Sequence, residues 1–80
     1  MRQAWGMDIE DVPISGDMIR LGQLLKFTGL AESGAHAATI IASGDVTVGG
    51  EVETRRGRQL VRGDVVSVMV PTGAISYRIA

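Results

Sequence analysis

Apolar side chains recur every three or four residues in the first half of this chain and every second residue in the second half. The first run with the helical spacing is Leu21, Leu24, Leu25 and Thr28. Gly29 follows this run, at the place where a glycine often ends a helix. The pattern predicts a helix over about residues 20–28.

A second helix is expected after a connection of about four residues. Ser33 can cap this helix, because a serine hydroxyl accepts a hydrogen bond from the first turn. Alanines and isoleucines continue to Ile41, and Gly44 closes the segment. Because the connection is short, the two helices should pack as one compact unit.

From Asp45 the apolar spacing changes to two residues, which is typical of strands with one buried face. Gly49 and Gly50 permit a tight hairpin turn between two such runs. The runs around this turn are Val46 and Val48 before it, and Val52 between Glu51 and Glu53 after it. Two further strands are expected at 65–70 and 75–79.

The first part of the chain lacks a clear period. We expect residues 1–17 to form an N-terminal arm with a possible edge strand, and residues 18–80 to form one domain. Pro13 restricts a strand in the arm to the edge of a sheet. The order of arm, two helices and then strands predicts an α+β fold rather than alternating βαβ units.

Composition excludes several kinds of site. The 80 residues include no cysteine and a single histidine, which argues against disulfides and against a zinc site. The eleven glycines follow neither the phosphate-loop nor the dinucleotide spacing. The acids Asp8, Glu10 and Asp11 are interpreted as a solvated charge run. We therefore expect no metal, no cofactor and no catalytic residue.

No apolar run approaches the length of about 20 residues that spans a bilayer. We therefore expect no membrane association, a cytoplasmic location and a monomer.

The positive charge is concentrated in one stretch, although the net charge is −1. Arg55, Arg56, Arg58 and Arg62 lie within ten residues that contain no acid. Guanidinium groups so close together favour a polyanion, because they form bidentate bonds to phosphate. The alternative is a solvated loop whose arginines pair with Glu51, Glu53 and Asp64. Charge alone leaves both readings open.

Other candidate contacts lie on the predicted helices. Arg20 and Lys26 flank the apolar face of the first helix and would extend the cationic surface, or they are ordinary surface charges. His36 in the first turn of the second helix would contact a phosphate or a base, or it is structural. Ser33 is a cap first and a ligand second.

Taken together, residues 20–66 resemble the S-four-type RNA-binding domain, named after the fourth protein of the small ribosomal subunit. The motifs that carry the resemblance are 20–26 (RLGQLLK), 29–30 (GL), 32–34 (ESG), 44–50 (GDVTVGG) and 63–66 (GDVV). With 51–58 (EVETRRGR), the chain is most similar to the short stand-alone, ribosome-associated members.

The resemblance implies a two-helix unit packed on a small antiparallel β-sheet. It also implies a face that binds structured RNA, expected to be ribosomal RNA, through phosphate and shape contacts. It implies RNA binding rather than catalysis. Many members carry basic residues where this chain has Gly34 and Ala38, which places more of the binding on the arginine segment, residues 54–58. The expected RNA-binding residues are Arg20, Lys26, Ser33, Gly34, His36, Thr54, Arg55, Arg56 and Arg58. The rival function is a protein-interaction module whose arginine segment docks on an acidic partner.

Overall fold

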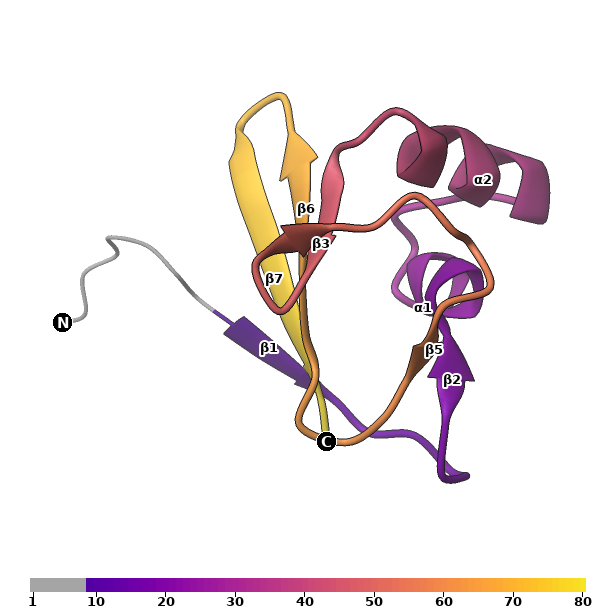
Figure 1. Ribbon diagram of the computed structural model, residues 1–80, viewed down its shortest axis with the longest axis vertical. Helices are drawn as coiled ribbons and strands as arrows, with labels where there is room; N and C mark the ends of the chain where they lie inside the picture. Colours follow the sequence, from indigo (N-terminus) through magenta and orange to yellow (C-terminus); the bar gives the residue numbers. More distant parts are fainter. Residues whose placement is uncertain (1–8) are drawn as a thin grey trace, which may run out of the picture.

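The computed structural model describes residues 9–80, and within this range the chain forms two helices and seven strands (Figure 1). In chain order they are β1 (Ile9–Val12), β2 (Ile19–Arg20), α1 (Leu21–Phe27), α2 (Gly34–Ala42), β3 (Val46–Val48), β4 (Glu51–Val52), β5 (Gln59–Leu60), β6 (Val65–Val70) and β7 (Gly73–Ile79). The helices lie together on one side of a five-stranded sheet of order β1-β7-β6-β3-β4 (Figure 1). A separate small sheet joins β2 to β5. The predicted α+β fold is confirmed.

Both helices lie close to their predicted positions. The three leucines of α1, Leu21, Leu24 and Leu25, are fully buried. At the start of α1 the backbone N–H of Arg20 donates to Oε1 of Gln23 at 3.0 Å, and after its end Gly29 has a φ of +86°. Neither helix is long and apolar enough to cross a membrane within the described range.

The predicted hairpin is present, but its second strand does not bury its apolar residue. Gly49 and Gly50 both have positive φ, as a tight hairpin turn requires. Val52 pairs with Thr47 and is 62% exposed, whereas Glu53 directly after β4 is only 7% exposed. The alternation of apolar and polar residues around Val52 therefore does not predict correctly which side chain is buried. The burial of Glu53 is stabilised by the arginines described below.

The sheet is mixed rather than purely antiparallel, because β1 runs parallel to β7. Val12 lies opposite Ile79, and the N–H of Ala80 donates to the carbonyl of Val12 at 2.8 Å. β1 lies at the edge of the sheet and ends directly before Pro13. Residues 1–8 of the predicted arm lie outside the described residues, and its boundary at residue 17 remains a prediction.

The buried core lies between the helices and the inner face of the sheet. It combines the leucines of α1 with Ile41 of α2 and with alternate residues of the strands, such as Val66 and Val68 of β6. Leu60 of β5 is also fully buried. Because β5 pairs with β2 immediately before α1, this anchor holds the arginine segment beside the start of α1.

Candidate nucleic-acid interface

The arginine segment folds back onto the N-terminus of α1. The first two N–H groups of this helix, on Leu21 and Gly22, donate to the carbonyls of Arg58 and Arg56, each at 2.9 Å. These N–H groups have no partner inside a helix, so the segment supplies the acceptors they need. Residues far apart in the sequence are thereby fixed next to each other.

Glu53 lies at the centre of this arrangement, and its carboxylate accepts four hydrogen bonds. Oε2 accepts from the backbone N–H of Arg55 at 3.0 Å and from its Nε at 2.9 Å. Oε1 accepts from Nη2 of Arg55 at 3.0 Å and from Nη1 of Arg58 at 2.8 Å. One nearly buried acid thus orients two guanidinium groups.

The same contacts change the ionisation of the acid. Hydrogen bonds from the Arg55 side chain, from its backbone N–H and from Arg58 hold the pKa of Glu53 far below its ordinary value of 4.5, and they outweigh the opposing effect of desolvation. In return, the Glu53 carboxylate raises the pKa of Arg55. The three side chains together carry one net positive charge at neutral pH.

The reading of the arginines as a self-paired loop is therefore correct for two of them. Arg55 and Arg58 pair with Glu53, but the carboxylate of Asp64 accepts the backbone N–H of Val61 instead. Arg62 donates to the carbonyl of Ile14 at 2.9 Å.

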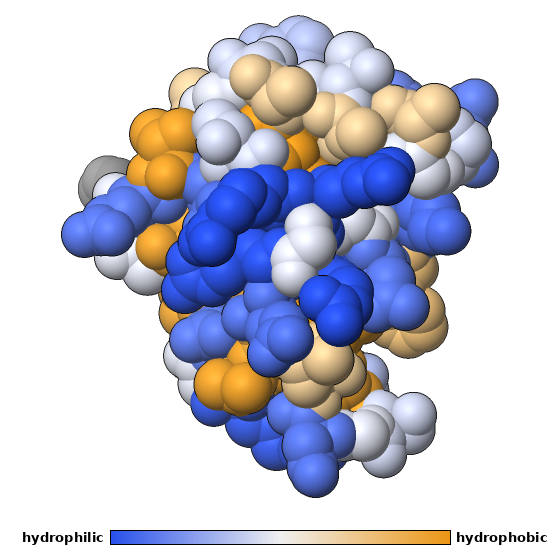
Figure 2. All heavy atoms as spheres, turned by 45° about the vertical axis from the view of Figure 1, so that its right-hand side comes forward, coloured by the Kyte–Doolittle hydropathy of each residue, from blue (hydrophilic) through white to orange (hydrophobic). Residues whose placement is uncertain are grey.

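A hollow of about 200 Å³, here called the cationic cavity, opens between the arginine segment and the two helices. It is lined by Arg20, Gly22, Gln23, Lys26, Gly34, Arg56 and Gly57. Nη1 of Arg20 donates to the carbonyl of Gly57 at 3.1 Å, which ties α1 to the segment. Lys26 and Arg56 form no ion pair among residues 9–80. Figure 2 shows very hydrophilic side chains gathered across the middle of the face that carries the helices.

Three other residues predicted to bind RNA, Ser33, His36 and Thr54, do not line the cationic cavity. Ser33 Oγ accepts the N–H of His36 at 3.1 Å, so Ser33 caps α2. Nδ1 of His36 accepts the N–H of Glu32 at 3.0 Å, which leaves Nε2 as the ring nitrogen that can donate. Thr54 is exposed and lines neither the cationic cavity nor a second hollow formed by Arg55, Gly57, Arg58 and Gln59. RNA contacts by Ser33, His36 and Thr54 remain predictions.

Sequence reasoning missed the positioning roles of three residues in this region, although Glu53 was among the acids expected to pair with the arginines in the alternative reading. Glu53 positions two arginines, Gln23 holds the start of α1, and the backbone N–H of Gly22 donates to the carbonyl of Arg56. The available signal for Glu53 was an acid two residues before an arginine-rich run. For Gln23 the signal was its position three residues after Arg20, where the glutamine of a capping box lies.

Comparison with known proteins places these features in a family. The family described as S4 domain matches residues 12–76. The "Probable ribosome maturation protein RlbA" of Bacillus subtilis (strain 168) is 40% identical over 57 residues, which cover 71% of this chain and 80% of the relative. The "Putative RNA-binding protein YbcJ" of Escherichia coli (strain K12) is 49% identical over 49 residues, or 61% of this chain and 70% of the relative.

Proposed function

The chain belongs to the S4 domain family, and on this premise we propose that it binds structured ribosomal RNA and serves in ribosome maturation. The names of the two relatives support this proposal, since one refers to RNA binding and the other to ribosome maturation. The observation that carries it is the cationic cavity, where Arg20, Lys26 and Arg56 converge around a hollow. Neither Lys26 nor Arg56 is neutralised by an acid within residues 9–80.

The interface would hold phosphates in two ways. Lys26 and Arg56 would bind them directly, because a charge-assisted bond to phosphate is strong and both side chains lack an intramolecular partner in the described range. Arg55 and Arg58 would present the donors that Glu53 does not use, in an orientation set by that acid. The proposal is binding without catalysis, by a monomer in the cytoplasm.

A salt titration tests the proposal. If about four phosphates on looped RNA are neutralised, log affinity for ribosomal RNA should fall with log salt at a slope of about −3 in a filter-binding assay. The double variant Arg55→Glu, Arg56→Glu should lose most of this binding. Unchanged binding by the double variant would refute the assignment of the arginine segment. Absence of binding by the intact chain would favour the protein-interaction module.

Substitution of Gly22 probes the cationic cavity itself. A Cβ at this position would lie 3.4 Å from the carbonyl oxygen of Arg56, an ordinary contact, so Gly22→Ala should fold and bind RNA like the intact chain. Removing a glycine from a helix should add roughly 0.5–1 kcal/mol to the free energy of unfolding. Gly22→Glu would place a carboxylate in the cavity and should weaken RNA binding by at least about tenfold. Equal affinities of the two variants in filter binding would show that RNA does not use the cavity.

A further inference from the structure

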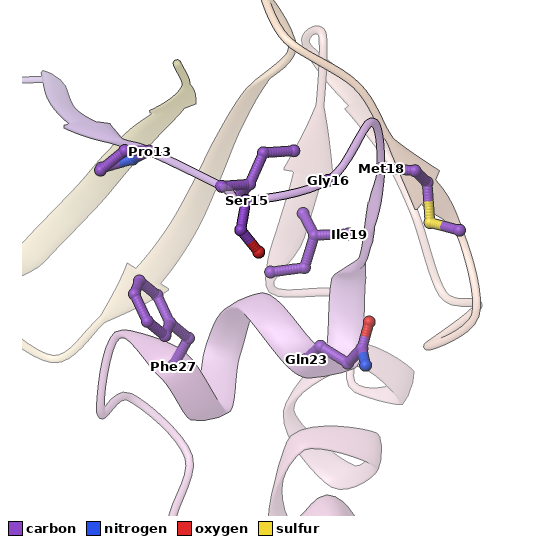
Figure 3. Close-up of a pocket in the computed structure, with 8 residues that line it drawn as sticks. Pro13, Ser15, Gly16, Met18, Ile19, Gln23 and Phe27 are labelled. Carbon is purple, nitrogen blue, oxygen red and sulfur yellow. The ribbon is translucent and has the colours of Figure 1, made fainter.

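An apolar groove of about 430 Å³ lies beside the cationic cavity (Figure 3). Its apolar lining comes from the segment between β1 and α1 and from the end of α1: Pro13, Ile14, Met18, Ile19 and Phe27. Ser15 and Gln23 add polar groups to this lining, and Ser15 turns its hydroxyl toward α1 (Figure 3). A hollow with apolar walls and a few polar groups is typical of ligand sites.

Phe27 is the conspicuous residue of this groove. Its side chain is 67% exposed although it is the last residue of α1, next to the core. Within residues 9–80 the other aromatic residue, Tyr77, is buried. The ring therefore contributes little to the core and presents an aromatic surface to whatever enters the groove.

The groove is continuous with the proposed RNA-binding face. Gln23 lines both hollows, and Lys26 of the cationic cavity directly precedes Phe27 in the chain. An RNA strand with a phosphate in the cationic cavity would thus bring a neighbouring nucleotide to the groove. This continuity with a cationic surface favours a nucleotide over an apolar protein segment as the occupant.

We propose that the groove takes one unstacked nucleobase, from a loop or bulge of the bound RNA, that stacks on Phe27. The inference rests on the proposed function and specifies which part of an RNA the chain recognises. Unpaired bases that are splayed out on aromatic rings are the usual targets of specific RNA recognition. Gln23 would read the base edge, since its Oε1 is occupied by the N–H of Arg20 and its amide N–H groups are left to donate.

Two RNAs with the same number of phosphates test this proposal: a hairpin with an unpaired loop and a fully paired duplex. Phe27→Leu keeps an apolar side chain but removes the ring, and it should weaken binding of the hairpin by about tenfold, within the range known for base stacking. Duplex binding and the salt dependence of hairpin binding should stay unchanged, because no ion pair is lost. Phe27→Tyr keeps a ring and should bind the hairpin like the intact chain. Both variants should unfold at nearly the temperature of the intact chain, since the side chain is exposed.

The outcomes separate this inference from the proposed function. If Phe27→Leu binds the hairpin as tightly as the intact chain while Lys26→Ala weakens both RNAs, the base site is refuted and RNA binding stands. That result would point to a protein segment as the occupant of the groove. Equal weakening of hairpin and duplex by Phe27→Leu also overturns stacking. If the intact chain binds neither these RNAs nor ribosomal RNA, the proposed function itself fails.

Discussion

Replacement of Lys26 and Arg56 together by alanine is expected to weaken RNA binding by at least about a hundredfold. Each charge-assisted contact contributes roughly 1.5–3 kcal/mol, and about 1.4 kcal/mol corresponds to a factor of ten in affinity. Both side chains line the cationic cavity, and no acid pairs with them within residues 9–80. The slope of log affinity against log salt should also become shallower by roughly 1.4, at about 0.7 for each phosphate contact on unpaired RNA. Filter binding over a salt series measures both effects.

The matched control is the double variant Arg62→Ala, Arg78→Ala, which removes the same two positive charges from other places. Arg62 bonds to the carbonyl of Ile14, and Arg78 pairs with Asp11 at 2.8 Å, so neither lines the cationic cavity. This variant should bind RNA within about threefold of the intact chain, since only long-range, salt-screened attraction is lost. Similar weakening by both double variants would mean that net charge, rather than the cavity, determines affinity.

The elements of this fold were predictable wherever their determinants are local. The helical spacing of Leu21, Leu24 and Leu25 located α1, and the glycine pair at 49–50 located the β3-β4 hairpin. Both signals depend on neighbours in the sequence, because apolar periodicity and turn geometry are properties of short segments. The order of these elements was then sufficient to predict an α+β fold.

Features that depend on distant partners were not predictable in this way. The parallel pairing of β1 with β7 joins the two ends of the described range, and no local pattern sets its direction. The burial of Glu53 has a local cause, because its partners Arg55 and Arg58 lie two and five positions away, but the alternation around Val52 indicated that Val52 rather than Glu53 would be buried.

The candidate site also combines features that were predictable from the sequence with features that were not. From the sequence, Arg55, Arg56 and Arg58 looked equivalent as expected contacts, and Arg62 was the one arginine of the cluster left out of the expected RNA-binding residues. The structure separates them by partner: Arg55 and Arg58 share one acid, Arg56 lines the cationic cavity, and Arg62 bonds to a distant carbonyl. Arg20 joins them through a bond that spans 37 positions in the chain, which spacing rules do not detect.

Glu53→Gln is expected to loosen the arginine segment and to lower the unfolding temperature. Glutamine keeps the size of the side chain but loses the negative charge that both guanidinium groups share, and its amide N–H groups would face their N–H donors. Trypsin cleaves after arginine, so limited digestion reports opening of the segment directly. Cleavage after Arg55, Arg56 and Arg58 should become several-fold faster than in the intact chain. Glu51→Gln is the matched control, because Glu51 is exposed and forms no ion pair within residues 9–80.

The pH dependence of stability distinguishes the electrostatic contribution of Glu53 from the steric effect of replacing its side chain. Its pKa in the folded chain lies far below the ordinary value of 4.5, so on acidification the unfolded state takes up the proton first. The resulting stabilisation is fully present above about pH 5 and is lost as the pH falls below about 4.5 toward the folded-state pKa. The unfolding temperatures of the intact chain and Glu53→Gln should therefore differ most near neutral pH, and the difference should shrink progressively as the pH falls below about 4.5. A difference that stays constant over this range would show that glutamine perturbs the segment sterically rather than by removing the charge that holds Arg55 and Arg58 in place.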